Sequence, residues 1–305
     1  MDPIERALPP LERINYDSPL AIQRVLAQRG LGALKRYGQN FLVNRNFRKE
    51  LLDALDFSPG ATVWEIGPGL GAMTEELLER GAKLVAFEID RGYVALLQEL
   101  FGAYSTFTLI PGDVLRTWKV AEPADYFFGN LPYNIAATLL GNLIEGNTLF
   151  MRMVITVQRE VAQRISASPG SRDYSSITVL CNTAYRVRPL RVMSGNSFFP
   201  RPRVDSQGIQ FDIRTDRDPA QYSLYLRPLI RALFVSRRKT VYNTLRTYLA
   251  ALSPSLERDD MAVTLLRNAG IPPQERPERL ATDDFIALAQ GLERAYPFGS
   301  GRQCP

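Results

Sequence analysis

The sequence predicts an α/β fold, a doubly wound and mostly parallel sheet followed by a small all-α domain at the carboxyl-terminal end. Two observations lead to this prediction. Strand-like apolar runs alternate with helical segments between residues 62 and 167, which is typical of parallel strands joined by crossover helices. After residue 213 the pattern is helical only.

The stretch from residue 62 to residue 90 gives the clearest structural and functional signal. Its predicted strand, helix and second strand are residues 62–66, 72–80 and 83–89. Between the first two lie Gly67, Gly69 and Gly71, which permit a sharp turn and a close approach of the backbone to a ligand. Glu88 ends the second strand, 21 residues past Gly67, where a carboxylate can accept both hydroxyls of a ribose. We therefore expect a nucleoside-bearing cofactor, although the glycines alone would also fit a structural turn.

The other elements follow from periodicity and from turn residues. Further helices are expected at residues 20–28, 46–56, 92–102, 134–145, 158–167, 222–252, 258–269 and 282–295, and further strands at 105–110, 125–128 and 151–157. Two β-rich runs, residues 177–192 and 204–213, predict a hairpin with an antiparallel strand at or near the sheet edge. Residues 214–220 are polar and predict a linker. The chain thus divides into an N-terminal extension (1–36), an α/β domain (37–213) and a helical domain (214–305).

Composition excludes several classes of protein. Hydrophobic residues make up 45% of the chain and charged residues 23%, with no apolar run long enough to span a membrane and no secretory signal. Cys181 and Cys304 are too few for a disulfide framework or a zinc site, so we expect a cytoplasmic protein without a metal. The chain has no histidine, which removes Ser-His-Asp chemistry and imidazole bases.

The charge is distributed unevenly along the chain. Residues 213–305 hold 14 Lys and Arg against 10 Asp and Glu, while the net charge of the whole chain is +5. A basic helical domain suits a polyanionic partner, but a solvated arginine-rich surface explains the charge equally well.

Asn130, Leu131, Pro132 and Tyr133 follow the fourth strand of the α/β region, at the sheet edge where open α/β sheets bind ligands. The amide oxygen of Asn130 and the carbonyl of Leu131 can each accept one N–H, and Tyr133 offers a flat face for stacking. This set suits a planar base with an exocyclic amine. A strand-ending turn before a capped helix is the alternative.

Together with these motifs, the rest of the sequence resembles a known family, the small-subunit ribosomal RNA adenine dimethyltransferases. Loss of these enzymes gives kasugamycin resistance in bacteria. The resemblance extends from about residue 37 to about residue 290. The matching pieces, in the order of the family, are GQNFL (38–42), EIGPGLGAMT (65–74), FEID (87–90), GDVL (112–115), NLPYNI (130–135), QREVAQR (158–164), FFPRPRVDS (198–206), RRKT (237–240) and RPERL (276–280). No single piece is unique, but nine in order are very specific.

The resemblance implies a Rossmann-like class I methyltransferase with a seven-stranded sheet, one strand of which is antiparallel. The cofactor would be S-adenosylmethionine. Asn40 and Leu42 would close over it, Gly67 would lie against its methionine part, Glu88 would hold the ribose and Asp113 the adenine amine.

The same resemblance implies the substrate. Asn130 would bridge cofactor and target adenine, the Leu131 carbonyl would accept an amine proton, and Tyr133 and Phe198 would stack on the two faces of the base. The family dimethylates N6 of two adjacent adenosines in the loop of the hairpin near the 3′ end of small-subunit (16S) rRNA, during ribosome assembly. A monomer is expected.

Three alternatives remain open at the level of sequence. The first is a large-subunit rRNA methylase of the kind that confers macrolide resistance, which is the nearest enzyme. The second is a ribosome-assembly factor without catalytic turnover, and the third is a nicotinamide-dependent oxidoreductase.

Arg201 and Arg203 stand where the family more often has proline and lysine. Basic residues that could follow RNA phosphates are Arg201, Arg203, Arg237, Arg238 and Lys239.

Overall fold

The computed structural model describes residues 13–32, 39–236, 238–252 and 258–297, without the side chains of residues 133, 134 and 220. The chain forms two compact units that interleave along the sequence. The first comprises Met1–Leu139, Phe150–Arg159 and Pro189–Phe211, and the second comprises Leu140–Leu149, Glu160–Arg188 and Asp212–Pro305. The boundaries predicted after residues 36 and 213 cut the chain into consecutive pieces instead, and that division remains a prediction.

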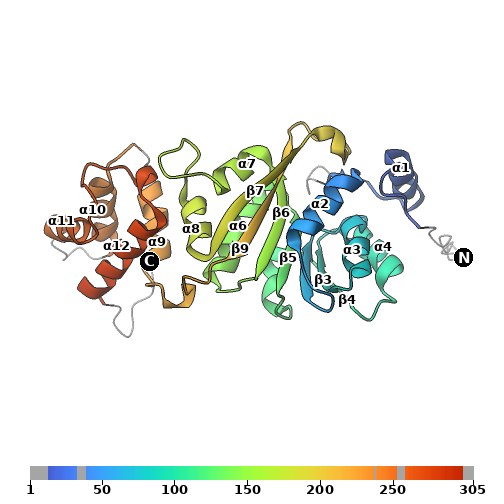
Figure 1. Ribbon diagram of the computed structural model, residues 1–305, viewed down its shortest axis with the longest axis horizontal. Helices are drawn as coiled ribbons and strands as arrows, with labels where there is room; N and C mark the ends of the chain where they lie inside the picture. The colour runs from blue at the N-terminus through green and yellow to red at the C-terminus, as the bar shows by residue number, and fades with distance from the viewer. Residues whose placement is uncertain (1–12, 33–38, 237, 253–257, 298–305) are drawn as a thin grey trace, which may run out of the picture. The chain divides into compact units, whose positions relative to one another are not determined.

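A seven-stranded sheet has the strand order β4-β3-β2-β5-β6-β9-β7 (Figure 1). Its strands are β2 (Thr62–Ile66), β3 (Lys83–Glu88), β4 (Phe107–Pro111), β5 (Tyr126–Asn130), β6 (Arg152–Gln158), β7 (Tyr185–Met193) and β9 (Ser206–Ile213). The pairs β2–β3, β2–β5, β3–β4 and β5–β6 are parallel. The sheet contains one antiparallel strand, which confirms the predicted fold class.

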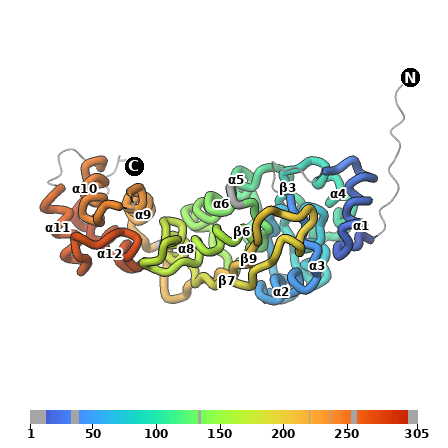
Figure 2. The backbone as a smooth tube through the Cα atoms, turned by 90° about the horizontal axis from the view of Figure 1, so that it is seen from above, coloured from blue at the N-terminus to red at the C-terminus, as the bar shows by residue number. Residues whose placement is uncertain are grey.

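Helices in the first unit cover the parallel strands and supply its core. They include α1 (Pro19–Gln28), α2 (Arg45–Leu55), α3 (Ala72–Glu79), α4 (Arg91–Phe101) and the short α5 (Val114–Thr117). Helix α3 packs on β3, α4 packs on β3 and β4, and α2 packs on β6. Because both faces are covered, the central strands read as continuous apolar runs; Val63 and Phe127 are fully buried. Figure 2 shows α1 beside α4, where Ile22 and Leu96 belong to one apolar cluster.

A second, two-stranded sheet joins residues far apart in sequence. Strand β1 (Phe41–Leu42) pairs antiparallel with β8 (Phe198–Phe199), so that Phe41 lies opposite Phe199 and Leu42 opposite Phe198. From the sequence we expected neither a helix nor a strand at residues 37–42, of which 37 and 38 lie outside the described residues. The pairing brings the GQNFL and FFPRPRVDS motifs together.

The β-rich interpretation of residues 177–184 is wrong, because these residues form most of helix α8 (Ser176–Ala184). Ser175 caps the helix: its N–H donates to Thr178 Oγ1 at 3.1 Å, and the two hydroxyls are 3.2 Å apart. Every turn of α8 is buried, so the helix shows no polar face and its apolar run resembles a strand.

Helices also build the core of the second unit. Those after the linker are α9 (Leu226–Phe234), α10 (Val241–Leu252), α11 (Arg258–Asn268) and α12 (Thr282–Ala295). Among the described residues after Ile213 there is no strand, as expected, but the predicted segment 222–252 is two helices rather than one. Leu229, Leu249 and Phe285 are fully buried in one cluster with Val179 of α8. The remaining helices of the chain are α6 (Tyr133–Glu145) and α7 (Arg159–Ile165).

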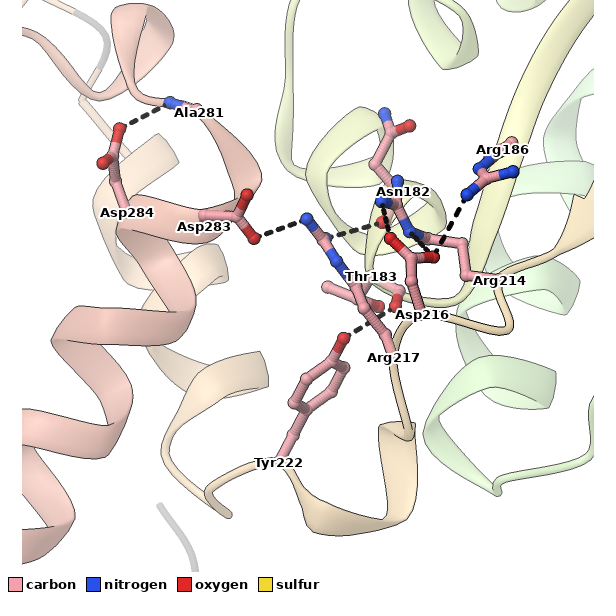
Figure 3. A network of polar contacts seen from close by, with 10 residues as sticks. All are labelled: Asn182, Thr183, Arg186, Arg214, Asp216, Arg217, Tyr222, Ala281, Asp283 and Asp284. Atoms are coloured by element: carbon pink, nitrogen blue, oxygen red, sulfur yellow. Dashed lines mark hydrogen bonds and ion pairs between the residues drawn. The ribbon is translucent and has the colours of Figure 1, made fainter.

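Residues 214–222, which begin with the predicted linker, are held at several points within the second unit (Figure 3). The Arg214 N–H donates to the Ala184 carbonyl at 2.8 Å, and the Arg214 side chain pairs with Asp216 at 2.7 Å. Arg217 donates to the carbonyl of Asn182 and forms an ion pair with Asp283. The stretch is polar, as predicted, and these hydrogen bonds and ion pairs attach it to the end of α8 and to the start of α12.

Candidate active site

The carboxyl ends of the parallel strands meet at one edge of the sheet, where open α/β sheets bind ligands. A cavity of about 340 Å³ lies there. It is lined by all six residues that we expected around a cofactor, namely Asn40, Leu42, Gly67, Glu88, Asp113 and Asn130. Strand topology therefore brings together side chains that are up to 90 positions apart in sequence.

The glycine loop after β2 requires glycine for its backbone conformation. Gly67 and Gly69 have φ angles of 69° and 57°, in the left-handed region that other residues rarely adopt. A Cβ on Gly69 would lie 3.1 Å from Cε1 of Phe41, so the β1 segment packs closely on the loop. The Gly67 N–H donates to the Phe87 carbonyl at 2.9 Å, which ties the loop to the end of β3.

Glu88 at the end of β3 is held by two backbone donors. Its Oε2 accepts the Gly69 N–H at 3.1 Å and its Oε1 accepts the Asp90 N–H at 2.9 Å. The residue is 4% exposed, and burial raises the pKa of its carboxyl above the usual range. The carboxylate is thus fixed in the cavity wall before a ligand arrives, and each oxygen retains a further lone pair.

Asp113 follows β4 and caps the short helix α5, where its Oδ1 accepts the Leu115 N–H at 3.0 Å. The turn before it needs Gly112, whose φ is 125°. Asp113 and Glu88 lie at the ends of adjacent parallel strands. The cavity therefore carries two carboxylates along one wall.

The Asn130 amide is clamped at both ends. Its Nδ2 donates to the Asn40 carbonyl at 3.0 Å, and its Oδ1 accepts from Thr156 Oγ1 at 2.6 Å. Because a carbonyl oxygen can only accept, the contact with Asn40 fixes which end of the amide is the oxygen. Thr156 lies directly opposite Asn130 in the β5–β6 ladder and is 1% exposed.

The other residues expected to act on a substrate base lie in different environments. Leu131 is 4% exposed, and its N–H donates to the Thr156 carbonyl at 2.9 Å. Phe198 is 5% exposed and belongs to the apolar core with Leu42, and it does not line the cavity. Tyr133 begins helix α6, and its side chain lies outside the described part of the structure. The stacking roles of Tyr133 and Phe198 remain predictions.

Several cavity residues were not anticipated as site residues from the sequence, among them Tyr16, Ile22, Glu65 and Thr156. Glu65 and Thr156 are polar residues inside otherwise apolar strands, and that contrast could have marked them. Ile22 gives no such sign, because an amphipathic pattern predicts a packed helix but not the surface on which it packs. Tyr16 precedes that helix, in a stretch without a periodic pattern.

Glu65 is the most deeply buried carboxyl group of the cavity. It is 2% exposed, and its Oε2 accepts from Thr74 Oγ1 at 2.7 Å. Burial, with a smaller effect of the nearby Glu88, raises the pKa of Glu65 to about 8, although the hydrogen bond from Thr74 acts in the opposite direction. Glu65 is therefore mostly protonated at neutral pH, and of the two carboxyls on these neighbouring strands Glu88 is the one that carries charge more readily.

Two further observations concern possible ligands and membranes. Within the described ranges, no three Asp, Glu or Cys side chains are grouped in a way that could hold a metal ion. In the same part of the chain, none of the helices is both long and apolar enough to cross a membrane.

Solved structures share the fold. A dimethyladenosine transferase from Plasmodium falciparum is 24% identical, with a TM-score of 0.70 over 82% of this chain and 96% of its own. The 23S rRNA methyltransferase ErmE is 21% identical, with a TM-score of 0.62 over 83% of this chain and 100% of its own. At these identities the likeness concerns the fold alone.

Sequence comparison identifies the family. The family model described as ribosomal RNA adenine dimethylase matches residues 32–266. A ribosomal RNA small subunit methyltransferase A from Treponema denticola is 38% identical over 283 residues, which cover 90% of this chain and 94% of that protein. A protein of the same name from Borreliella afzelii is 37% identical over 280 residues, covering 92% and 95%. The chain belongs to the ribosomal RNA adenine dimethylase family.

Proposed function

We propose that this protein is a 16S rRNA (adenine-N6,N6)-dimethyltransferase. It transfers methyl groups from S-adenosylmethionine to two adjacent adenosines in the loop of the 3′-terminal hairpin of small-subunit rRNA, in the cytoplasm and during ribosome assembly. Family membership and the names of the relatives support the substrate. The single observation that supports the chemistry best is the clamped amide of Asn130, which lines the same cavity as Glu88.

The cavity suits S-adenosylmethionine, the methyl donor that this fold and family imply. Glu88 offers carboxylate oxygens to the hydroxyls of a ribose, and Asp113 offers an acceptor to an adenine amine. Gly67 leaves the backbone open to the methionine part, since the space where its Cβ would stand has only the Asn130 carbonyl oxygen nearby, at 3.9 Å. The cofactor supplies an electrophilic methyl group on a sulfonium.

The protein's own contribution to the reaction is the orientation of the target amine. The N6 lone pair of adenine is delocalised into the ring and is a poor nucleophile. Hydrogen bonds from the two N–H groups to Asn130 Oδ1 and to the Leu131 carbonyl favour a pyramidal nitrogen whose lone pair faces the methyl group. Alignment supplies much of the rate. The nitrogen gains a methyl group and loses a proton to water, so no histidine base is required.

The target base must leave its stack to reach the cavity, which takes least energy in a loop. Arg201, Arg203, Arg238 and Lys239 are exposed and suit contacts with phosphates. Arg237 lies outside the described residues. We infer that the protein acts as a monomer on the much larger ribosomal particle.

The experiment that tests this function is methyl transfer from labelled S-adenosylmethionine to small subunits that lack the modification. The modified bases are identified by mass spectrometry. Wild type should produce dimethyladenosine, and Asn130→Ala should lose about 10²-fold or more in rate, since one positioned hydrogen-bonding group in an active site commonly contributes that much. Cofactor affinity, measured by calorimetry, should fall only partly.

Asn46→Ala is the matched control, because Asn46 is exposed at the start of α2 and does not line the cavity. It should methylate like wild type. Wild-type rates in Asn130→Ala would contradict the role of Asn130. A folded, cofactor-binding wild type that transfers no methyl group would contradict the function itself and favour an assembly factor without turnover.

A further inference from the structure

Residues 13–32, here called the N-terminal segment, lie against the cofactor cavity. From the sequence we expected only a helix at residues 20–28 of the N-terminal extension, and no site residue there. Tyr16 and Ile22 of this segment line the cavity together with Gly67 and Leu70. Both are buried, with exposed fractions of 7% and 1%.

Tyr16 fixes the glycine loop from outside the sheet. Its hydroxyl donates to the Leu70 carbonyl at 3.0 Å, between Gly69 and Gly71. Those two glycines have φ angles of 57° and 88°, so the loop has left-handed backbone on both sides of the bonded carbonyl. Burial raises the pKa of Tyr16 above its ordinary value, and the phenol therefore remains a neutral donor at every pH in the working range.

An ion-pair network holds the segment in place. The Arg48 side chain, 5% exposed, pairs with Asp17 of the segment at 2.6 Å and with Glu76 of α3 at 2.9 Å. The same guanidinium donates to the Leu42 carbonyl at 3.0 Å. One buried cation thus connects the N-terminal segment, the β1 segment that carries Asn40 and Leu42, and the helix that follows the glycine loop.

Apolar contacts complete the attachment. Residues of the segment share one buried cluster with residues of β1, the glycine loop and α4, namely Ile14, Tyr16, Ile22, Val25, Leu26, Phe41, Leu70, Tyr93 and Leu96. The fit is close at the start of α4, where a Cβ on Gly92 would lie 2.3 Å from Cδ2 of Leu31. The segment therefore packs as a structural part of the first unit.

We propose that the N-terminal segment is part of the cofactor site, in which Tyr16 is a positioning residue for the glycine loop and Ile22 forms an apolar wall of the cavity. The proposal rests on the proposed function only for the identity of the cofactor. It assigns a role in cofactor binding to residues that precede the glycine loop by about 50 positions.

The first test is Tyr16→Phe, which keeps the ring and removes the donor to Leu70. Binding of S-adenosylmethionine and of S-adenosylhomocysteine is measured by calorimetry without RNA. We expect both dissociation constants to rise about 3- to 10-fold, the effect of one lost hydrogen bond. The matched control is Tyr225→Phe, because Tyr225 is buried in the second unit, donates to the Tyr296 carbonyl at 2.8 Å and does not line the cavity.

The control should leave both dissociation constants unchanged even if it lowers the melting temperature as much as Tyr16→Phe does. An unchanged affinity in Tyr16→Phe, or an equal loss in both variants, would overturn the proposal, because the hydroxyl would then serve only general stability.

A second pair of variants tests the wall. Ile22→Ala and Leu26→Ala remove the same number of carbon atoms from the same helix, but only Ile22 lines the cavity. Ile22→Ala should weaken cofactor binding several-fold more than Leu26→Ala, at a temperature where circular dichroism shows both folded. Equal cofactor affinities in the two variants would refute the role of Ile22 as an apolar wall of the cavity. Since no methyl transfer is measured, these outcomes are independent of whether the RNA substrate is correctly assigned.

Discussion

At the scale of single residues, Glu65 links the cavity to the stability of the fold. Its carboxyl is buried beneath the glycine loop with the Thr74 hydroxyl as a partner, and burial raises its pKa to about 8 from an ordinary 4.5. In the unfolded chain the group titrates near its ordinary value. Between these two pH values the folded protein therefore binds more protons than the unfolded chain does.

We predict that the free energy of unfolding falls as pH rises from about 5 to 8. The contribution of Glu65 is fully present below pH 4.5 and is lost as the pH rises through about 8, with a slope of up to about 1.4 kcal/mol per pH unit. Glu88, whose pKa is also raised by burial, acts in the same direction. Urea denaturation at several pH values should show a flatter dependence for Glu65→Gln. The exposed Glu79→Gln should retain the wild-type slope, and equal slopes for Glu65→Gln and wild type would contradict the assignment.

For Asn130, the position and the chemistry of the side chain could be predicted from the sequence, but its hydrogen-bond partners could not. Its position after the fourth strand and its amide chemistry were predictable from the strand pattern. Its two partners, the Asn40 carbonyl and Thr156, were not, because they lie 90 positions before it and 26 positions after it. Such pairings depend on strand order and register, which local patterns do not contain.

At the scale of elements, α8 shows how a largely buried helix is mistaken for a strand. Ile177, Thr178 and Val179 are β-branched and favour strands, but the tertiary environment of a buried position outweighs that preference. Thr178 is fully buried, and its Oγ1 accepts the Ser175 N–H at 3.1 Å and donates to the Arg164 carbonyl at 2.6 Å. The Thr178 hydroxyl thus caps the first turn of α8 and connects this helix to the end of α7.

We expect Thr178→Val, which keeps the side-chain volume, to lower the free energy of unfolding by about 0.5–1.5 kcal/mol, because the Ser175 N–H and the Arg164 carbonyl lose their hydrogen-bond partner. Thr178→Ser keeps the hydroxyl and should recover most of the loss. Urea denaturation followed by circular dichroism measures both. A Thr178→Val variant as stable as wild type would mean that water or a shifted helix satisfies the two backbone groups.

At the scale of the whole molecule, the fold class and the helical character of the last third were predictable from alternation and periodicity. The interleaving of the two compact units was not. Leu140–Leu149 and Glu160–Arg188 belong to the second unit although they lie within the predicted α/β domain. Their apolar residues show that they are buried, but a pattern of burial does not specify which core they join.

The burial of Cys181 in α8 makes this thiol a native reporter of how often the second unit opens. The side chain is completely buried, and burial raises the pKa of the thiol to about 12, so the folded protein should hardly react with thiol reagents. Labelling therefore requires local unfolding, and its rate should increase in Thr178→Val about tenfold for every 1.4 kcal/mol of stability that the opening unit loses. Peptide mass mapping separates Cys181 from Cys304, which lies outside the described residues. Equally rapid labelling in wild type and variant would show that α8 opens independently of that contact, whereas a matched increase would give the opening equilibrium of one unit inside the intact chain.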